Sequence, residues 1–398
     1  MTRAAPWLDR FRRVTSSGAF IAEIDGLRFV AIASVVLFHL AVDLSIKSPA
    51  RYARADGWAA QLAWNGFRGV ELFFVISGFI LALPFAAHFL RGAPKVRLRA
   101  YLLRRVTRLD PPYVACMLLL FAAHLARGRT ALELGPHLGA SLVYLHNLIF
   151  SAESAINNVA WSLEIEIQFY LLAPFLSLLF AIPSRTLRRS LMAALCAVCA
   201  ALSWRYIEPG GRAYLSILRF LQFFLAGLLL ADVFVTDWQS RPAQGRTWDA
   251  VSLAGWPLLF VLWSTMALPT AGGAPARGSL AGALLFPAMV FLLYCAAFRG
   301  EVTSRFFRNP WVSTIGGMCY TIYLFHNPLL GMAIRATGAI APFASYAANL
   351  GLQLLMTTPA VLLPSAVYFM LVEKPCMRRD WPQRLYAHLA SLPALRGA

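Results

Sequence analysis

Long apolar runs recur along the whole chain, and they constrain its fold more than any other feature of the sequence. About ten of them approach the ~20 residues that a helix needs to cross a bilayer. Only 14% of the residues are charged, whereas a soluble domain carries about 25%. Inside lipid, only helices and closed barrels satisfy their backbone, and runs of this length fit helices. The sequence therefore predicts an all-α polytopic membrane protein, a bundle of about ten transmembrane helices.

The predicted helices lie near residues 27–46, 68–90, 109–126, 160–182, 190–204, 216–235, 250–268, 280–298, 311–335 and 347–372. The segment 141–150 is apolar but too short to span, so we expect it to be re-entrant or interfacial.

Basic residues fall between these spans in an alternating pattern. With the N-terminus inside, most of the Lys and Arg residues lie in the inside segments 1–13, 91–108, 184–189, 236–249, 299–308 and 374–384. The positive-inside rule then predicts cytoplasmic N- and C-termini. Basic clusters beside a membrane contact anionic lipid, so the net charge of +18 does not indicate nucleic acid.

The chain is expected to have three parts and no appended extracytoplasmic domain. These are a basic cytoplasmic segment 1–26, a transmembrane domain 27–372 and a cytoplasmic tail 373–398.

Arg28 and His39 lie eleven residues apart in the first predicted helix. Because a helix turns 100° per residue, the two side chains share one face to within roughly 20° and lie ~16 Å apart along the axis. Ionisable groups at membrane depth are expensive and usually functional. Counting residues from the predicted helix ends places Glu166 and His326 in the same outer half of the bilayer as His39. We therefore expect an acid–base centre there, with Arg28 at the cytoplasmic mouth.

Several of these residues also fit structural roles. A histidine inside the membrane suits a hydrogen bond across a helix interface, and His326 precedes Pro328, whose kink frees a backbone carbonyl. The arginines within 104–108 fit the positive-inside rule as well as they fit a ligand. Glu71 suits the start of a helix, where the dipole favours a carboxylate. No metal-ligand spacing or disulfide framework is evident among the cysteines at 116, 196, 199, 295, 319 and 376.

Six motifs follow one another along the chain, namely GLRFVAIASVVLFH, GVELFFVISGF, RRVTRLDPPYV, WSLEIEIQFYLLAP, YTIYLFHNPL and EKP. They resemble the acyltransferase 3 family in the family's own order, from about residue 24 to 375. Members of that family O-acylate bacterial polysaccharides, lipopolysaccharide, peptidoglycan, Nod factors and macrolides. The resemblance implies a membrane acyltransferase that uses acyl-CoA as a co-substrate and holds no permanent cofactor.

The resemblance also implies roles for single residues. Arg28 and His39 match the family's signature of Arg, ten residues and His, in which the histidine is the proposed catalytic residue. Arg105 and Arg108 match an Arg-x-x-Arg motif implicated in binding acyl-CoA. Glu71 matches the acidic residue before the FFV-SGF motif.

The Trp-Ser-Leu motif departs from the family pattern. Many relatives carry two adjacent carboxylates there, whereas this chain has Glu166 followed by Ile167, with Glu164 as an extra acid. Glu166 is the better match to the family. The residues expected to contact the acceptor are Glu71, Trp161, Gln168 and Tyr323. Some members continue into an extracytoplasmic esterase-like domain, so this chain is expected to finish the transfer alone or with a separate partner.

We expect the protein to move an acyl group, by default acetyl, from cytoplasmic acyl-CoA to a hydroxyl of a cell-surface or exported carbohydrate. Its expected location is the bacterial plasma (inner) membrane. The residues expected to bind the donor phosphates are Arg28, Arg105 and Arg108. At the other end, His39 is expected to act as general base, with Glu166 orienting it. His326 is expected to bind the acceptor or relay the proton.

Two alternatives remain open at this point. A macrolide or another small secondary metabolite fits the sequence equally well as the acceptor. From another class, a proton-coupled transporter or flippase also uses buried histidine and glutamate as a proton path. That hypothesis predicts repeated halves and discontinuous helices, and we find no internal repeat.

Overall fold

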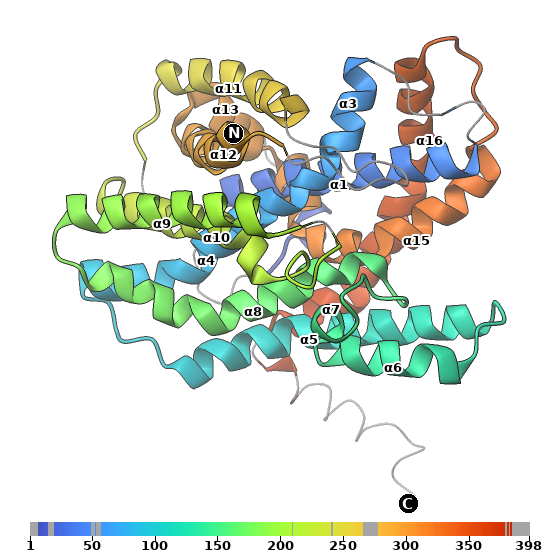
Figure 1. Cartoon of the computed structure of the whole chain (residues 1–398), viewed down its shortest axis with the longest axis horizontal. Coiled ribbons are helices and arrows are strands. Elements are labelled where there is room, and N and C mark those ends of the chain that lie inside the picture. Colours follow the sequence, from blue (N-terminus) through green and yellow to red (C-terminus); the bar gives the residue numbers. More distant parts are fainter. Residues whose placement is uncertain are drawn as a thin grey trace, which may run out of the picture.

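The computed structural model describes residues 7–14, 20–48, 57–208, 210–239, 242–265 and 278–378, together with positions 52, 380, 381 and 383. Within these ranges all regular structure is helical and no strand occurs (Figure 1). The predicted all-α fold is confirmed.

In the described part of the chain, eight helical stretches are long and apolar enough to cross a membrane, namely Ala22–Lys47, Trp58–Arg91, Leu98–Leu125, Asn158–Ala181, Arg185–Tyr206, Ile217–Thr236, Leu280–Arg299 and Tyr346–Cys376. Their main helices are α1 (Ala22–Lys47), α4 (Gly69–Arg91), α5 (Leu98–Leu125), α8 (Trp161–Leu176), α9 (Arg185–Tyr206), α10 (Ile217–Thr236), α12 (Leu280–Arg299) and α16 (Tyr346–Tyr368). A π-helical turn, Phe369–Glu373, and α17 (Lys374–Cys376) extend α16.

The remaining described helices are short or less apolar, namely α3 (Trp58–Asn65), α6 (Ala131–Leu142), α7 (His146–Phe150), α11 (Arg246–Thr265), α13 (Glu301–Phe307), α14 (Pro310–Gly317) and α15 (Cys319–Thr337). The segment 141–150 forms the end of α6 and all of α7, so it does not span.

Two of the roughly ten predicted spans are not among these eight stretches. The predicted span 250–268 corresponds to α11, which carries Asp249 and Pro257 and whose predicted last residues, 266–268, lie outside the described residues. The predicted span 311–335 is divided into α14 and α15, which meet at Met318. Within the described residues, eight candidate spans are found where about ten spanning helices were expected.

The break at Met318 follows from close packing of α14 against α1. A Cβ atom on Gly316 would lie 1.7 Å from the backbone oxygen of Asp25, so the last turn of α14 rests directly on the α1 backbone. Glycine alone permits this approach.

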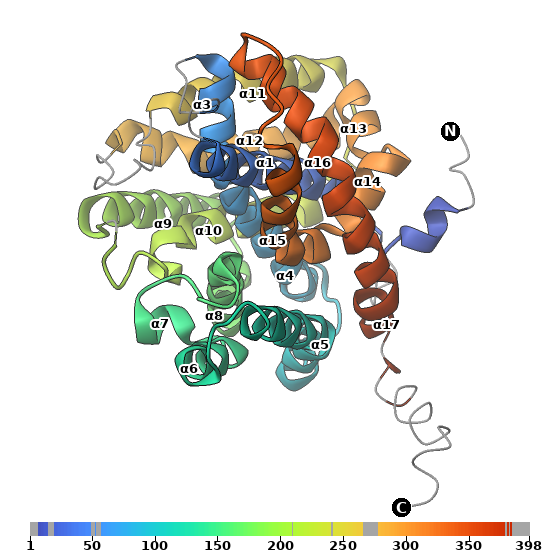
Figure 2. The same cartoon turned by 90° about the vertical axis from the view of Figure 1, so that its right-hand side faces the viewer.

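Glycines also bring α4 against both of its neighbours, α1 and α10. A Cβ on Gly69 would lie 2.4 Å from the Ala31 oxygen of α1, and one on Gly78 would lie 2.3 Å from the Phe224 oxygen of α10. Small residues allow this approach between helices in a membrane. Figure 1 shows α4 and α10 side by side, and Figure 2 shows α1, α4 and α15 together in the centre of the bundle. Gly69 and Gly78 therefore let α4 pack directly on the backbones of α1 and α10.

Candidate active site

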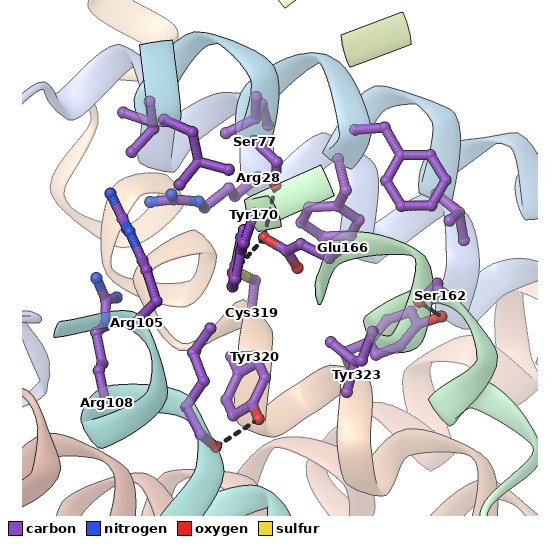
Figure 3. Close-up of a pocket in the computed structure, with 18 of the residues that line it drawn as sticks. Arg28, Ser77, Arg105, Arg108, Ser162, Glu166, Tyr170, Cys319, Tyr320 and Tyr323 are labelled. Carbon is purple, nitrogen blue, oxygen red and sulfur yellow. Dashed lines mark hydrogen bonds between the residues drawn. The ribbon is translucent and has the colours of Figure 1, made fainter. Parts of the chain in front are cut away.

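A cavity of about 120 Å³ lies between the central helices (Figure 3). Its wall combines segments that are far apart in the sequence. The N-terminal segment, α1, α4, α5, α8, α15 and the π-helical turn all contribute to it. The polar side chains that line it are Arg13, Arg28, Ser77, Arg105, Arg108, Ser162, Glu166, Tyr170, Tyr320, Tyr323 and Glu373.

One end of the cavity is rich in arginine. Asp25 is fully buried and accepts hydrogen bonds from two of the arginines, Arg13 Nε at 2.9 Å and Arg28 Nη1 at 2.5 Å. Arg105 and Arg108 form no ion pair within the part of the chain that the structure describes, and the Nε atom of Arg108 is buried without a hydrogen-bond partner. This arginine end therefore carries more positive than negative charge.

Arg13 lies before α1 and outside the spanning segments. Burial and the neighbouring Arg28 charge lower the pKa of the Arg13 guanidinium to about 9, while the Asp25 carboxylate opposes both effects. Arg13 is therefore protonated at neutral pH and adds to the positive charge of the arginine end.

Glu166 lies midway along the cavity. Its Oε1 atom accepts hydrogen bonds from Ser77 Oγ at 2.8 Å and from the Tyr170 hydroxyl at 2.9 Å. Figure 3 shows the Glu166 side chain between the arginines and Tyr323. Among the described residues, no hydrogen bond joins Glu166 to a histidine.

The far end of the cavity is closed by Tyr323 and Ser162. The Tyr323 hydroxyl donates to the Val159 carbonyl at 3.0 Å, so Ser162 Oγ donates to Tyr323 at 2.7 Å. Just beyond this pair, the ring of His326 lies 5.6 Å from that of Tyr323. The ring of His39 lies 4.8 Å from that of His326, at an interplanar angle of 37°. The structure therefore places two histidines side by side, directly behind the end wall of the cavity.

The hydrogen bonds of His326 fix its tautomer. Its Nδ1 lies 2.7 Å from the Tyr323 carbonyl oxygen and 3.2 Å from that of Ile322. Because a carbonyl only accepts, Nδ1 carries the proton of the neutral ring and Nε2 keeps its lone pair. That Nε2 atom is buried without a hydrogen-bond partner.

The Pro328 kink does not account for the position of His326. Pro328 frees the carbonyl of Leu324, four residues earlier. Asn157 Nδ2 donates to that carbonyl at 3.0 Å. The structural role considered for His326 in the sequence is thus taken by Asn157.

Sequence comparison identifies the family of this architecture. The acyltransferase domain of the acyltransferase 3 family matches residues 21–372. The chain belongs to the acyltransferase 3 family. The histidine pair and most of the cavity wall lie within the matched residues, whereas Arg13 and Glu373 lie just outside them.

Relatives of known name share this domain. The O-acetyltransferase OatA of Staphylococcus aureus (strain NCTC 8325 / PS 47) is 23% identical over 334 residues, 79% of this chain and 51% of the relative. The peptidoglycan O-acetyltransferase OatA of Listeria monocytogenes is 26% identical over 341 residues, 80% of this chain and 51% of the relative. A putative peptidoglycan O-acetyltransferase of Bacillus subtilis, YrhL, is 28% identical over 225 residues, 50% of this chain and 30% of the relative. The chain spans about half the length of the relatives from S. aureus and L. monocytogenes. No solved structure matches it.

Several residues selected from the acyltransferase 3 motifs do not line the cavity. Glu71 is buried, with its Oε2 atom 3.6 Å from Arg68 Nη1. Gln168 Oε1 accepts from the backbone N–H of Ile217 at 2.9 Å, which caps the start of α10. Trp161 packs on Phe220, with ring centroids 5.6 Å apart. Tyr323 is the one predicted acceptor contact on the cavity wall.

The extra acid of the Trp-Ser-Leu motif has a structural contact. Glu164 Oε2 accepts from the backbone N–H of Asn147 at 2.8 Å and so anchors the start of α7. Arg104, in contrast, is exposed and does not line the cavity.

Sequence reasoning missed six polar side chains of the cavity wall, namely Arg13, Ser77, Ser162, Tyr170, Tyr320 and Glu373. Five of them lie inside the quoted motifs, so the motifs contained a usable signal. Arg13 lies in the basic N-terminal segment, where no pattern distinguishes it from its neighbours.

Proposed function

We propose that this protein O-acylates a carbohydrate, taking an acyl group, by default acetyl, from acyl-CoA. The observation that carries the proposal is a single cavity with unpaired guanidinium groups at one end and two adjacent imidazoles behind the other. CoA carries several phosphate charges and a thioester at opposite ends of a long arm. The guanidinium groups at one end of the cavity suit the phosphates, and the imidazoles behind the other end suit a reaction at the thioester.

The arginine end suits the donor phosphates. Guanidinium groups match phosphate oxygens in geometry and stay charged. Arg105 and Arg108 lack carboxylate partners among the described residues, so a phosphate completes their contacts without displacing an ion pair. We place this end on the cytoplasmic side, where acyl-CoA is made.

The distance along the bundle suits the pantetheine arm. Arg28 and His39 are eleven residues apart on α1, which corresponds to a rise of ~16 Å. Ser77, Glu166 and Tyr170 line the path between them. Glu166 therefore belongs to the wall of the donor channel in this proposal, in place of the histidine-orienting role expected from the sequence.

At the far end, we assign His39 as general base. Its imidazole removes the proton from an acceptor hydroxyl, and the hydroxyl oxygen forms a bond to the thioester carbonyl carbon. The bond from that carbon to sulfur then breaks, and the CoA thiolate takes up the proton. His326 lies beside His39 with an unprotonated Nε2, which suits it to relay the proton. Tyr323 and Ser162 separate the described cavity from this pair, so their side chains must move when the acyl group arrives.

The acceptor is proposed from the relatives. Those from L. monocytogenes and B. subtilis are named as peptidoglycan O-acetyltransferases, the latter putatively, which supports a carbohydrate hydroxyl. The proposed location is the bacterial plasma membrane, with acceptor transfer on the outer side.

The test combines product analysis with donor binding. A deletion strain should lose base-labile acetyl groups from surface glycans or exported metabolites, measured by mass spectrometry. The wild-type gene should restore them and His39→Ala should not. Purified His39→Ala protein should still bind acetyl-CoA by isothermal titration calorimetry. Restored acetylation by His39→Ala refutes the base assignment. Unchanged acetylation in the deletion strain favours the transporter alternative.

A further inference from the structure

The segment 7–14 borders the arginine end of the cavity, to which it contributes Arg13. It includes a short 3-10 helix, Leu8–Phe11, and Figure 2 shows it beside α14, in blue. Trp7 packs edge-on against Trp311 of α14, with ring centroids 5.2 Å apart at 71°. The backbone carbonyl of Arg10 accepts a hydrogen bond from Lys374 Nζ of α17. Residues 7–14, which we call the N-terminal strap, are thus fixed to two helices that are far away in the sequence.

The strap contributes one cation to the cavity. The Arg13 side chain is 7% exposed and lines the same wall as Arg28 and Arg108. Its only described carboxylate contact is from Nε to Asp25 Oδ2. A guanidinium has five N–H donors, so its Nη groups keep four for another acceptor.

The charge balance around Arg13 favours an anion. Four arginines line this end of the cavity, and Asp25 pairs with two of them. Two further carboxylates line the cavity. Glu373 accepts a hydrogen bond from Thr321, and Glu166 accepts hydrogen bonds from Ser77 and Tyr170. Asp25 therefore holds two guanidiniums in place without neutralising both.

We propose that Arg13 is a ligand for the phosphate groups of the donor nucleotide, held over the arginine end by the N-terminal strap. The inference rests on the proposed function and deepens it. Arg13 contacts the phosphorylated nucleotide and makes no contact with the acyl-pantetheine arm. The strap is accordingly a specificity element for CoA thioesters over thioesters without phosphate.

The test compares two donors that differ in phosphate. Acetyl-CoA carries the phosphorylated nucleotide, whereas S-acetylpantetheine has the same thioester arm and no phosphate. Arg13→Ala should weaken acetyl-CoA binding about 10-fold or more, the effect of losing a charge-assisted hydrogen bond. Binding of S-acetylpantetheine should change less than 2-fold. Arg13→Lys keeps the charge and should fall between Arg13→Ala and wild type.

Arg10→Ala is the matched control. Arg10 lies in the same strap and is exposed, and Lys374 contacts its backbone carbonyl. The Arg10→Ala protein should bind acetyl-CoA like the wild type. If Arg13→Ala loses affinity equally for both donors, Arg13 has a purely structural role and the proposal is overturned. Unchanged acetyl-CoA binding by Arg13→Ala overturns it as well. If the wild type itself binds no acetyl-CoA, the proposed function fails instead.

A measurement on the wild-type protein guards against a variant that does not fold. Hydrogen exchange of the backbone amides in residues 7–14 should slow when CoA is added. Pantetheine at saturating concentration should leave it unchanged. No slowing by CoA, or equal slowing by both, contradicts the assignment of the strap to the phosphates.

Discussion

Two clusters of arginines in this molecule differ in the way their charge is balanced. The first, between α9 and α10, is paired on nearly every side. Asp232 is fully buried and accepts hydrogen bonds from Arg188 and, at 2.7 Å, from Arg189. Asp237 accepts from Arg189 and from Arg185, both at 2.7 Å. We call these five residues the α9–α10 cluster.

The second, which we call the cavity cluster, comprises Asp25 and the cavity-lining residues Arg13, Arg28, Arg105 and Arg108. Here one carboxylate serves two arginines, and the other two have no ion pair among the described residues. A buried charge without a partner is unfavourable, so it persists where a ligand supplies the partner. Both clusters gather arginines around a fully buried aspartate, so pairing with carboxylates is what distinguishes the structural cluster from the binding one.

The largest expected effect is the loss of stability when the α9–α10 cluster is broken. Asp232→Ala removes the carboxylate that two guanidiniums share in a buried site, and breaking a buried pair in this way destabilises a protein by about 3–5 kcal/mol. Chemical unfolding of the purified protein in detergent should show this loss. The folded fraction should bind acetyl-CoA normally. A loss below about 1 kcal/mol would show that this cluster is not structural.

The cavity cluster should respond in the opposite way. Arg105→Ala or Arg108→Ala should weaken acetyl-CoA binding about 10- to 100-fold, since each removes charge-assisted hydrogen bonds to phosphate. The free energy of unfolding should stay nearly constant, because neither guanidinium is paired. Titration calorimetry and unfolding on the same preparations measure both quantities. Arg189→Ala is the matched control and should have lower stability but unchanged affinity for acetyl-CoA. If Arg189→Ala loses affinity and the cavity variants lose stability, the two clusters do not differ as described.

The sequence alone could predict which residues lie at one depth, and less about which side chains face each other. His39 and His326 were expected in one layer, and their rings are 4.8 Å apart. Glu166 was expected in the same layer, yet it faces Ser77 and Tyr170. Depth follows from counting residues along a helix, whereas the facing partner depends on how each helix is rotated and packed.

The membrane-spanning helices show the same limit of prediction from sequence. Apolar runs identified the helical class and most of the helices, because the bilayer sets their length. The break at Met318 was missed, since it depends on the contact of Gly316 with the α1 backbone. The motif predicts an acceptor contact for Gln168, but its side chain caps the start of α10. Both depend on neighbours that are distant in sequence and leave no local pattern.

A smaller expected effect is the stabilisation of the protein by pyrophosphate, an anion that is not the donor. It also distinguishes the cavity cluster from the α9–α10 cluster. Pyrophosphate should stabilise the wild type against thermal unfolding, by about 1.4 kcal/mol at ten times its Kd. The Arg105→Ala/Arg108→Ala double variant should lose this gain, whereas Arg189→Ala should keep it. Equal stabilisation of all three proteins would show that pyrophosphate binds elsewhere.

The smallest effect is an acid response of the α9–α10 cluster. Asp237 lies just after α10, outside the spanning segment. Burial alone raises its pKa, but hydrogen bonds from Arg189 and Thr236 and the charges of Arg189 and Arg185 outweigh burial and lower the pKa. A lowered carboxyl pKa stabilises the fold above the unfolded value of about 3.9, and this stability is lost as pH falls through the folded pKa.

Thermal unfolding between pH 5 and pH 3 should reveal this contribution as a difference between variants. Other carboxylates titrate in the same range, so the wild type and Asp237→Asn are compared at each pH. The wild type should be the more stable at pH 5, and the difference should shrink towards pH 3. Arg105→Ala should run parallel to the wild type throughout, because Arg105 has no carboxylate partner among the described residues to lose. A converging Arg105→Ala curve would show that the cavity cluster is paired after all.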